Sequence, residues 1–167
     1  MKKRVVIAGS RNFNDYEMFA NIVGEFLKPI REEYELIIVS GHCSGTDLMG
    51  ERYAKENGFE VEIYPAEWKK YGRSAGPKRN KQMVDVADFA IAFPSVNGKG
   101  TQSMIKYAKQ KGIPIQIYQI SKNLLIDKKV YEEEKTAIFA IFSTFIVSGN
   151  NPMVGMTVAV AVEEASK

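Results

Sequence analysis

The chain of 167 residues contains only one cysteine, Cys43, and only one histidine, His42. A single cysteine excludes an intrachain disulfide, which is typical of proteins from a reducing compartment, so we expect a cytoplasmic protein. These two residues are too few for a zinc site of the Cys/His type. The sequence therefore predicts a fold that uses neither a disulfide nor a metal, and no motif predicts a cofactor.

The sequence also has little excess charge and no long apolar run. Its 23 basic and 20 acidic residues give a net charge of +3, which by itself does not favour a nucleic-acid partner. No apolar run reaches the roughly 18–20 residues that a membrane-spanning helix needs, so membrane contact is not expected. The first apolar run, 5–8, is too short for the core of a secretory signal peptide.

Short apolar runs alternate with stretches of helical periodicity along the first 120 residues. The runs are 5–8, 36–39, 61–64, 89–93 and 113–118, and each is largely apolar on both faces, as buried parallel strands are. The helical stretches are 16–27, 46–57, 77–86 and 101–111, with Asp15 expected to cap the first and Pro29 to follow its end. This order predicts an α/β fold: a Rossmann-like, doubly wound, five-stranded parallel sheet with helices on both faces.

The last part of the chain differs from the rest. We divide the chain into a domain of residues 1–120 and an extension of residues 121–167. The extension carries two apolar runs, 137–147 and 153–162, on either side of a turn signal. We interpret it as a helical hairpin that packs on the domain or on another subunit, which makes a homo-oligomer the expected assembly. A strand within 157–162 is an alternative.

Glycine and hydroxyl residues follow three of the predicted strands. Gly9 and Ser10 follow the first, and Arg11 beside them can contact a phosphate. The segment 40–47 follows the second and ends in Gly45-Thr46-Asp47 at a helix start. The segment 97–103 follows the fourth and repeats the pattern with Gly98, Gly100 and Thr101. Ligands bind beyond the carboxyl ends of such strands, so these loops predict a phosphate site on one rim.

Each of these loops also has a simpler interpretation. Gly9-Ser10-Arg11 is equally consistent with a tight turn and a surface arginine. Asp47 can accept hydrogen bonds from a ribose or simply cap its helix. Glu51 lies one turn later, and the pair can serve as catalytic carboxylates or form a solvated face. The segment 97–103 lacks the ending of a Walker A loop.

The segment 68–80 joins the third strand to the fourth and combines aromatic and basic residues. Trp68 and Tyr71 are candidates for stacking on a base. Arg73, Arg79 and Asn80 lie near a predicted helix start, where a phosphate is favoured. An irregular surface loop with a half-buried tryptophan is the alternative.

Taken in order, these residues resemble a known family. The series runs from Gly9-Ser10-Arg11 through Gly45-Thr46-Asp47, Trp68, Gly72-Arg73 and Arg79-Asn80 to Gly98-Lys99-Gly100-Thr101. It resembles the SLOG superfamily, and within it the YspA-like branch of small bacterial and phage proteins, over residues 3 to about 118. The resemblance implies a Rossmann-like fold and nucleotide-derived ligands. It also implies relatives that hydrolyse nucleoside monophosphates, bind single-stranded DNA or act as sensors.

The resemblance departs from the phosphoribohydrolases of the superfamily at one position. Those enzymes carry Pro-Gly-Gly-x-Gly-Thr-x-x-Glu with a catalytic glutamate, and the matching position here is Met104. Three functions follow as hypotheses. The first is binding of a phosphorylated nucleotide or a nucleotide-derived small molecule. The second is an N-glycosidase or deoxyribosyltransferase-like enzyme that uses Glu51 or Asp47. The third, weakened by the mild net charge, is single-stranded nucleic-acid binding.

Overall fold

A five-stranded parallel sheet forms the centre of the molecule in the computed structural model, which describes residues 1–120. The strands lie in the order β3-β2-β1-β4-β5. Their bounds are β1 Lys2–Gly9, β2 Glu35–Ser40, β3 Glu60–Ile63, β4 Phe89–Phe93 and β5 Ile115–Ile117. The predicted Rossmann-like, doubly wound sheet is confirmed.

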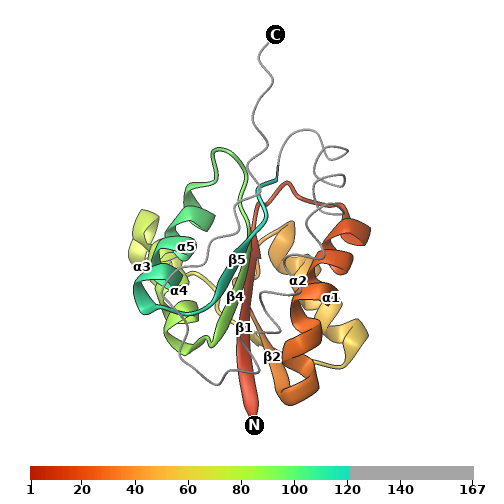
Figure 1. Cartoon of the computed structure of the whole chain (residues 1–167). Helices are drawn as coiled ribbons and strands as arrows, with labels where there is room; N and C mark the ends of the chain where they lie inside the picture. The colour runs from red at the N-terminus through yellow and green to blue at the C-terminus, as the bar shows by residue number, and fades with distance from the viewer. Residues whose placement is uncertain (121–167) are drawn as a thin grey trace.

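Helices cover both faces of the sheet, as Figure 1 shows. On one face lie α1 Tyr16–Glu33 and α2 Thr46–Asn57, and on the other lie α4 Ala75–Val86 and α5 Lys99–Lys111. A short helix, α3 Trp68–Tyr71, and a 3-10 turn, Gly72–Ser74, precede α4. The chain moves outward from β1 to β3 and then returns to β4 on the other side of β1. The loops after β1 and β4 therefore diverge at the carboxyl ends of these strands, where such folds bind ligands.

The two faces of the sheet have different cores. The α1 face is aromatic, and the ring centroids of Phe19 and Phe13 lie 5.3 Å and 5.5 Å from that of Phe93. The opposite face is built from smaller side chains, including Ala90, Ala92 and Ala108. Small side chains let helices approach a sheet closely. On this face the side-chain amide nitrogen of Asn80 in α4 donates to the carbonyl of Gly100 in α5 at 2.9 Å, so the second turn of α4 lies beside the start of α5.

Two local expectations are wrong. Pro29 lies inside α1 rather than after it, because the longer helix buries both Pro29 and Ile30 and ends where the Tyr34 amide donates to Ile30. Burial of two apolar side chains offsets the cost of a proline inside a helix, about 3 kcal/mol. Strand β3 is not buried on both faces: Val61 and Ile63 are exposed, because β3 is an edge strand.

The remaining elements match the expected ones, with shifted ends. The side chain of Asp15 accepts a hydrogen bond from the Met18 amide at 3.0 Å, which confirms the predicted cap. Helices α4 and α5 each begin two residues earlier than expected, at Ala75 and Lys99. Within residues 1–120, no helix is both long and apolar enough to cross a membrane. The predicted hairpin and the homo-oligomer it suggests concern residues 121–167, outside the described part.

Candidate functional site

A cleft of about 440 Å³ opens at the carboxyl ends of β1 and β4. Its walls are the loops after β1, β2 and β4, the segment of α3 and the 3-10 turn, and the amino-terminal halves of α4 and α5. Small-molecule sites usually have volumes of roughly 300–1,000 Å³, so the cleft has room for a ligand of nucleotide size. The four segments that carry the sequence motifs all contribute to this one cleft.

Three cations at the cleft have no partner within the described chain. Arg11 comes from the loop after β1, Arg73 from the 3-10 turn and Lys99 from the first turn of α5, and all three are exposed. Neither a hydrogen bond nor an ion pair to another residue of 1–120 holds any of these side chains. Unpaired cations around a concave surface raise the local concentration of anions.

The amino ends of α4 and α5 add to this positive potential. Neither helix has a side-chain cap, since Ser74 and Gly98 make no capping hydrogen bond. In α5 the Lys99 amide donates to Asn97, while the amides of Gly100 and Thr101 have no acceptor among residues 1–120. Free amides at a helix start attract anions because they point along the positive end of the helix dipole. An anion bound in this cleft therefore meets backbone donors as well as cations.

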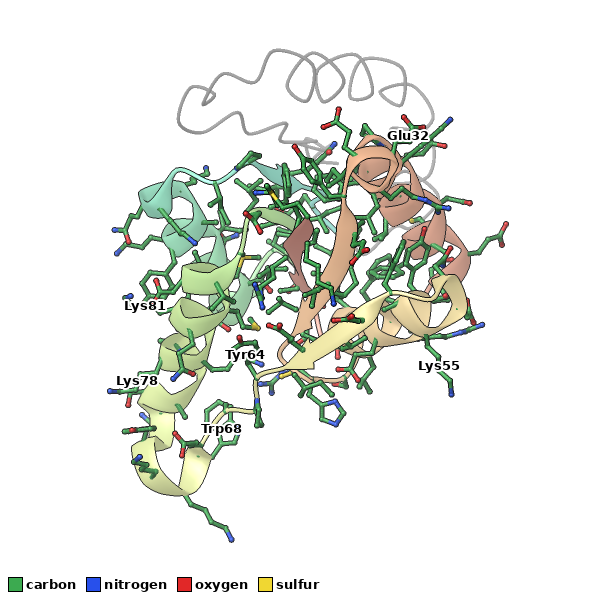
Figure 2. The ribbon with its side chains drawn as sticks, turned by 90° about the horizontal axis from the view of Figure 1, so that it is seen from below. Glu32, Lys55, Tyr64, Trp68, Lys78 and Lys81 are labelled. Carbon is green, nitrogen blue, oxygen red and sulfur yellow. The ribbon has the colours of Figure 1, made fainter. Side chains whose placement is uncertain are left out.

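Trp68 forms an apolar wall at one side of the cleft. Its side chain is 51% exposed and lies beside the first part of α4, as Figure 2 shows. A Cβ added at Gly76 would come within 3.3 Å of the Trp68 ring, a tight contact, so the glycine lets the ring lie close to the helix without a shift. The ring keeps an accessible surface that can stack on a planar ligand.

Asp47 is the carboxylate that lines the cleft. It is only 4% exposed, and burial raises its pKa to about 6. The Arg79 guanidinium and the amides of Cys43 and Gly9 oppose this rise. Arg79 does not prevail because its Nη1 lies 3.9 Å from the carboxylate, beyond hydrogen-bond distance. The side chain of Asp47 is therefore placed to accept from, or near pH 6 to exchange a proton with, a group in the cleft.

Arg79 lines the cleft but is used within the protein. It is 8% exposed; its guanidinium donates to the carbonyl of Gly41, to Cys43 Sγ and to the Asn80 amide oxygen. A Cβ on Gly41 would overlap the guanidinium. Arg79 and Asn80 therefore position the loop after β2 and the start of α5, and Arg11 and Arg73 are the arginines left to meet a phosphate.

The Gly45-Thr46 helix start does not line the cleft. The amide and the hydroxyl of Thr46 both donate to the carbonyl of Ser10, at 3.1 Å and 3.0 Å, and Thr46 is fully buried. Gly45 has a φ of +75°, and a Cβ there would lie 2.4 Å from the Ser10 carbonyl oxygen. These residues join the two loops to each other, and the donors of Thr46 that were predicted to meet a phosphate are already used.

Glu51 lies in a separate cluster. Its carboxylate accepts from the hydroxyl of buried Ser40 at 2.6 Å and lies 3.0 Å from Nδ1 of His42. His42 has a backbone φ of +56°, a conformation that residues other than glycine rarely adopt. Asp47 lines the cleft, whereas Glu51 is absent from its lining.

Tyr71 also lies away from the cleft. The ammonium groups of Lys70 and Lys78 lie 4.9 Å and 4.5 Å from the centre of its ring. Tyr71 instead lines a smaller groove between α3 and α4. Of the two aromatic residues predicted to stack on a base, only Trp68 is in the cleft.

The cleft brings together most of the predicted site and several residues that sequence reasoning missed. Lys99 stands between the glycines of the loop after β4, and its position in a Gly-Lys-Gly segment was the available signal. Ser103 follows one turn later on α5, where helical spacing indicates the same face. Cleft-lining predicted residues are Gly9, Ser10, Arg11, Asp47, Trp68, Arg73, Arg79, Asn80, Gly98, Gly100 and Thr101; missed ones include Asn12, Ser95, Lys99 and Ser103.

Solved structures with a similar fold are distant in sequence. DNA processing protein A from Streptococcus pneumoniae is 18% identical with a TM-score of 0.56, and the match covers 73% of this chain and 52% of that chain. The Helicobacter pylori protein of the same name, whose structure was described for its unique single-stranded DNA binding mode, is 14% identical with a TM-score of 0.56. The match covers 87% of this chain and 80% of that chain. The protein TM1055 is 17% identical with a TM-score of 0.52 and coverage of 79% and 81%.

At these identities, the structural matches establish the fold alone, and this chain spans about half of the S. pneumoniae protein. Sequence comparison is more specific. Residues 3–71 match the "YspA, cpYpsA-related SLOG family" (YAcAr). The "Gene 61 protein" of Mycobacterium phage D29 is 34% identical over 119 residues, which cover 68% of this chain and 94% of that protein. The chain belongs to the YspA, cpYpsA-related SLOG family.

Proposed function

We propose that the cleft binds a nucleoside phosphate or a related phosphorylated small molecule, as a sensing or processing protein would. The observation that carries the proposal is the set of Arg11, Arg73 and Lys99, which have no partner within residues 1–120 and surround uncapped helix starts. In this arrangement the phosphate lies at the start of α5, next to the amides of Gly100 and Thr101. Arg11 and Arg73 contact its oxygens.

The other walls of the cleft fit the rest of a nucleotide. Trp68 offers a ring surface to a base. Buried Asp47 is an acceptor for ribose hydroxyls, which donate well to carboxylates. Three unpaired cations against one carboxylate suit a ligand that carries two or three negative charges. Single-stranded DNA binding by the H. pylori protein of similar fold supports a ligand of this chemistry.

Calorimetric titration of the full-length protein with nucleoside mono- and diphosphates and ADP-ribose-type molecules tests the proposal. We expect at least one of them to bind below millimolar concentration. Arg11→Ala should weaken that ligand about tenfold or more, because a hydrogen bond to a charged group contributes about 1.5–3 kcal/mol.

Arg31→Ala is the matched control, because Arg31 is an exposed arginine in the last turn of α1 and does not line the cleft. It should leave the affinity unchanged. If every molecule of the panel binds no better than at millimolar concentration, the proposal fails. It also fails if both arginine variants weaken binding equally.

A second candidate, cleavage of the base from a nucleotide, is supported by Asp47. Its carboxylate is buried, lines the cleft and has a pKa raised to about 6 by that burial. A nearby carboxylate stabilises the oxocarbenium-like transition state of glycoside hydrolysis. However, Met104 occupies the position of the catalytic glutamate of the phosphoribohydrolases and lines the cleft as an apolar side chain. Asp47 would therefore have to act without that glutamate.

Chromatographic detection of free base after incubation with nucleoside monophosphates tests this candidate. Asp47→Asn should abolish release, while Glu51→Gln, outside the cleft, should retain it. If Glu51→Gln abolishes release and Asp47→Asn does not, Asp47 is not the catalytic carboxylate. If no nucleotide releases its base, the chain is not such an enzyme.

A further inference from the structure

The mild net charge of the chain hides a local concentration of positive charge on α3 and α4. Residues 66–82 contain six basic residues and one acidic residue, which leaves 17 basic and 19 acidic residues in the rest of the chain. This short segment therefore carries a net charge of +5, while the rest carries −2. Because Arg79 is buried, the exposed part of the segment has five basic side chains against Glu67, a net charge of +4. A surface of one sign attracts a polyanion even where the whole molecule is nearly neutral.

The cations of this segment lie on two sides of the α3–α4 junction. Arg73 lines the cleft, whereas Lys78 and Lys81 line a second groove of about 230 Å³ between α3 and α4. Figure 2 shows both lysines on the outer side of α4, with Trp68 beside the beginning of the same helix. The positive surface therefore continues from the mouth of the cleft to a groove outside it.

Contacts within the protein hold the lysines of the groove only loosely. Lys78 lies over the Tyr71 ring at 4.5 Å, and Lys81 pairs with Asp85 in an exposed pair at 2.7 Å. An exposed pair of this kind contributes little free energy, so a phosphate can displace it. The one carboxylate in the lining of the groove is that of Glu67, so its cations outnumber its anions.

Aromatic surface next to these cations indicates which polyanion fits. The ring of Trp68 is half exposed and lines the cleft, and Lys69 and Lys70 follow Trp68 directly in α3. Unpaired bases stack on aromatic rings, whereas a duplex hides its bases and an acidic peptide has none. Alternating phosphates and unpaired bases therefore match this surface better than a duplex or an acidic protein does.

We propose that the ligand of the cleft is the terminal nucleotide of a single-stranded nucleic acid, whose following phosphates lie on the α3–α4 lysines and their groove. This inference rests on the proposed function, because it needs the cleft to hold a nucleotide. It adds a second contact surface, outside the cleft, for the phosphodiester backbone. The strand passes Trp68 between the two surfaces and stacks a base on its ring.

Fluorescence anisotropy with the full-length protein tests the inference. The labelled probes are single strands of eight DNA or RNA nucleotides with a free 5′-phosphate, and a poly-glutamate of equal charge. Unlabelled AMP and dTMP serve as competitors. At low salt we expect a strand to bind about tenfold or more tightly than the monophosphates. The double variant Lys78→Gln/Lys81→Gln should weaken binding of the strand. It should also lower the slope of log affinity against log salt concentration by roughly 0.7 for each phosphate that the variant no longer neutralises. The affinity for monophosphates should not change.

Lys106→Gln/Lys109→Gln is the matched control, since these exposed lysines have the same spacing on α5 and line neither the cleft nor the groove. It should change nothing. The inference is overturned if strands bind no better than monophosphates, if the control pair has the same effect, or if poly-glutamate binds equally well. It is also overturned if Arg11→Ala leaves strand binding intact. Failure of monophosphate binding, in contrast, removes the proposed function itself.

Discussion

The two Gly-Thr loops of this protein are alike in sequence and differ in what they do. Each follows a parallel strand and begins a helix, α2 at Thr46 and α5 at Lys99. In the first loop the amide and hydroxyl of Thr46 are both used by the Ser10 carbonyl. In the second, the amides of Gly100 and Thr101 have no acceptor within residues 1–120. The same motif therefore joins two loops in one place and leaves free backbone amides, the proposed anion site, in the other.

The two loops differ because of where they lie in the sheet. The strand order reverses direction between β1 and β4, and of the two loops only the loop after β4 lies at this point. The loop after β2 lies against the loop after β1, because β1 and β2 are neighbours and α1 and α2 cover the same face. The loop after β4 lies across from the loop after β1, with helices on the opposite face, so a cleft separates them. Helix starts attract anions only where the fold leaves them uncovered.

Substitution of the loop glycines should give the largest contrast. Gly45→Ala places a Cβ 2.4 Å from the Ser10 carbonyl oxygen at a φ of +75°, so it should lower the free energy of unfolding by about 4 kcal/mol, from strain and overlap together. Urea denaturation followed by circular dichroism measures this. A loss below about 1 kcal/mol would show that the first loop is not the tight joint described.

Asp47 gives a pH-dependent contrast of comparable size. Its folded pKa of about 6 lies above the ordinary value of 3.8, so between these pH values the folded state holds more protons than the unfolded state. Stability should therefore fall as pH rises from about 4 to 6, by about 3 kcal/mol relative to Asp47→Asn. Denaturation of both proteins from pH 4 to 7.5 gives the difference. A difference that does not vary with pH contradicts the burial of this charge.

The two threonines should separate stability from binding. Thr46→Val removes a buried hydrogen bond to Ser10 and should lower the free energy of unfolding by about 1–2 kcal/mol. Thr101→Val removes a hydroxyl that has no hydrogen bond within the described chain and lines the cleft, so it should weaken nucleotide binding with little change in stability. Urea denaturation and calorimetric titration of both variants test this. The opposite pattern would exchange the roles of the two loops.

Gly100→Ala should have the smallest effect. Nothing lies within 4 Å of a Cβ at this position, and alanine favours a helix more than glycine does. The free energy of unfolding should rise by about 0.5–1 kcal/mol. Thermal unfolding is a sufficient measurement. A clear loss of stability would mean that the start of α5 is as crowded as the start of α2.

Much of this architecture can be predicted from the sequence, because strands, helix starts and their order depend on local patterns. Asp15 and the buried runs of β1, β2 and β4 are examples. The different roles of the two loops depend on contacts between residues far apart in the sequence. The partner of Thr46 is Ser10, 36 residues earlier, and the partner of Arg79 is Gly41, 38 residues earlier. Sequence patterns identify residues suited to bind a phosphate, but only the fold decides which of them are already used.

The exposure of β3 and the position of Tyr71 have the same explanation. The apolar pattern of Val61 and Ile63 predicts a buried strand, but the strand order puts β3 at an edge. Tyr71 follows Trp68 by three residues in α3, and yet Trp68 lines the cleft whereas Tyr71 lines the groove.

Amide chemical shifts of the full-length protein, recorded by nuclear magnetic resonance during titration with a nucleoside monophosphate, test the central claim most directly. The amides of Gly98, Gly100 and Thr101 should shift in a saturable manner, together with that of Arg11. Those of Gly45 and Thr46 should move little, since they lie outside the cleft. Saturable shifts at Gly45 and Thr46 without shifts at Gly100 and Thr101, or no saturable shift at all, would contradict the account.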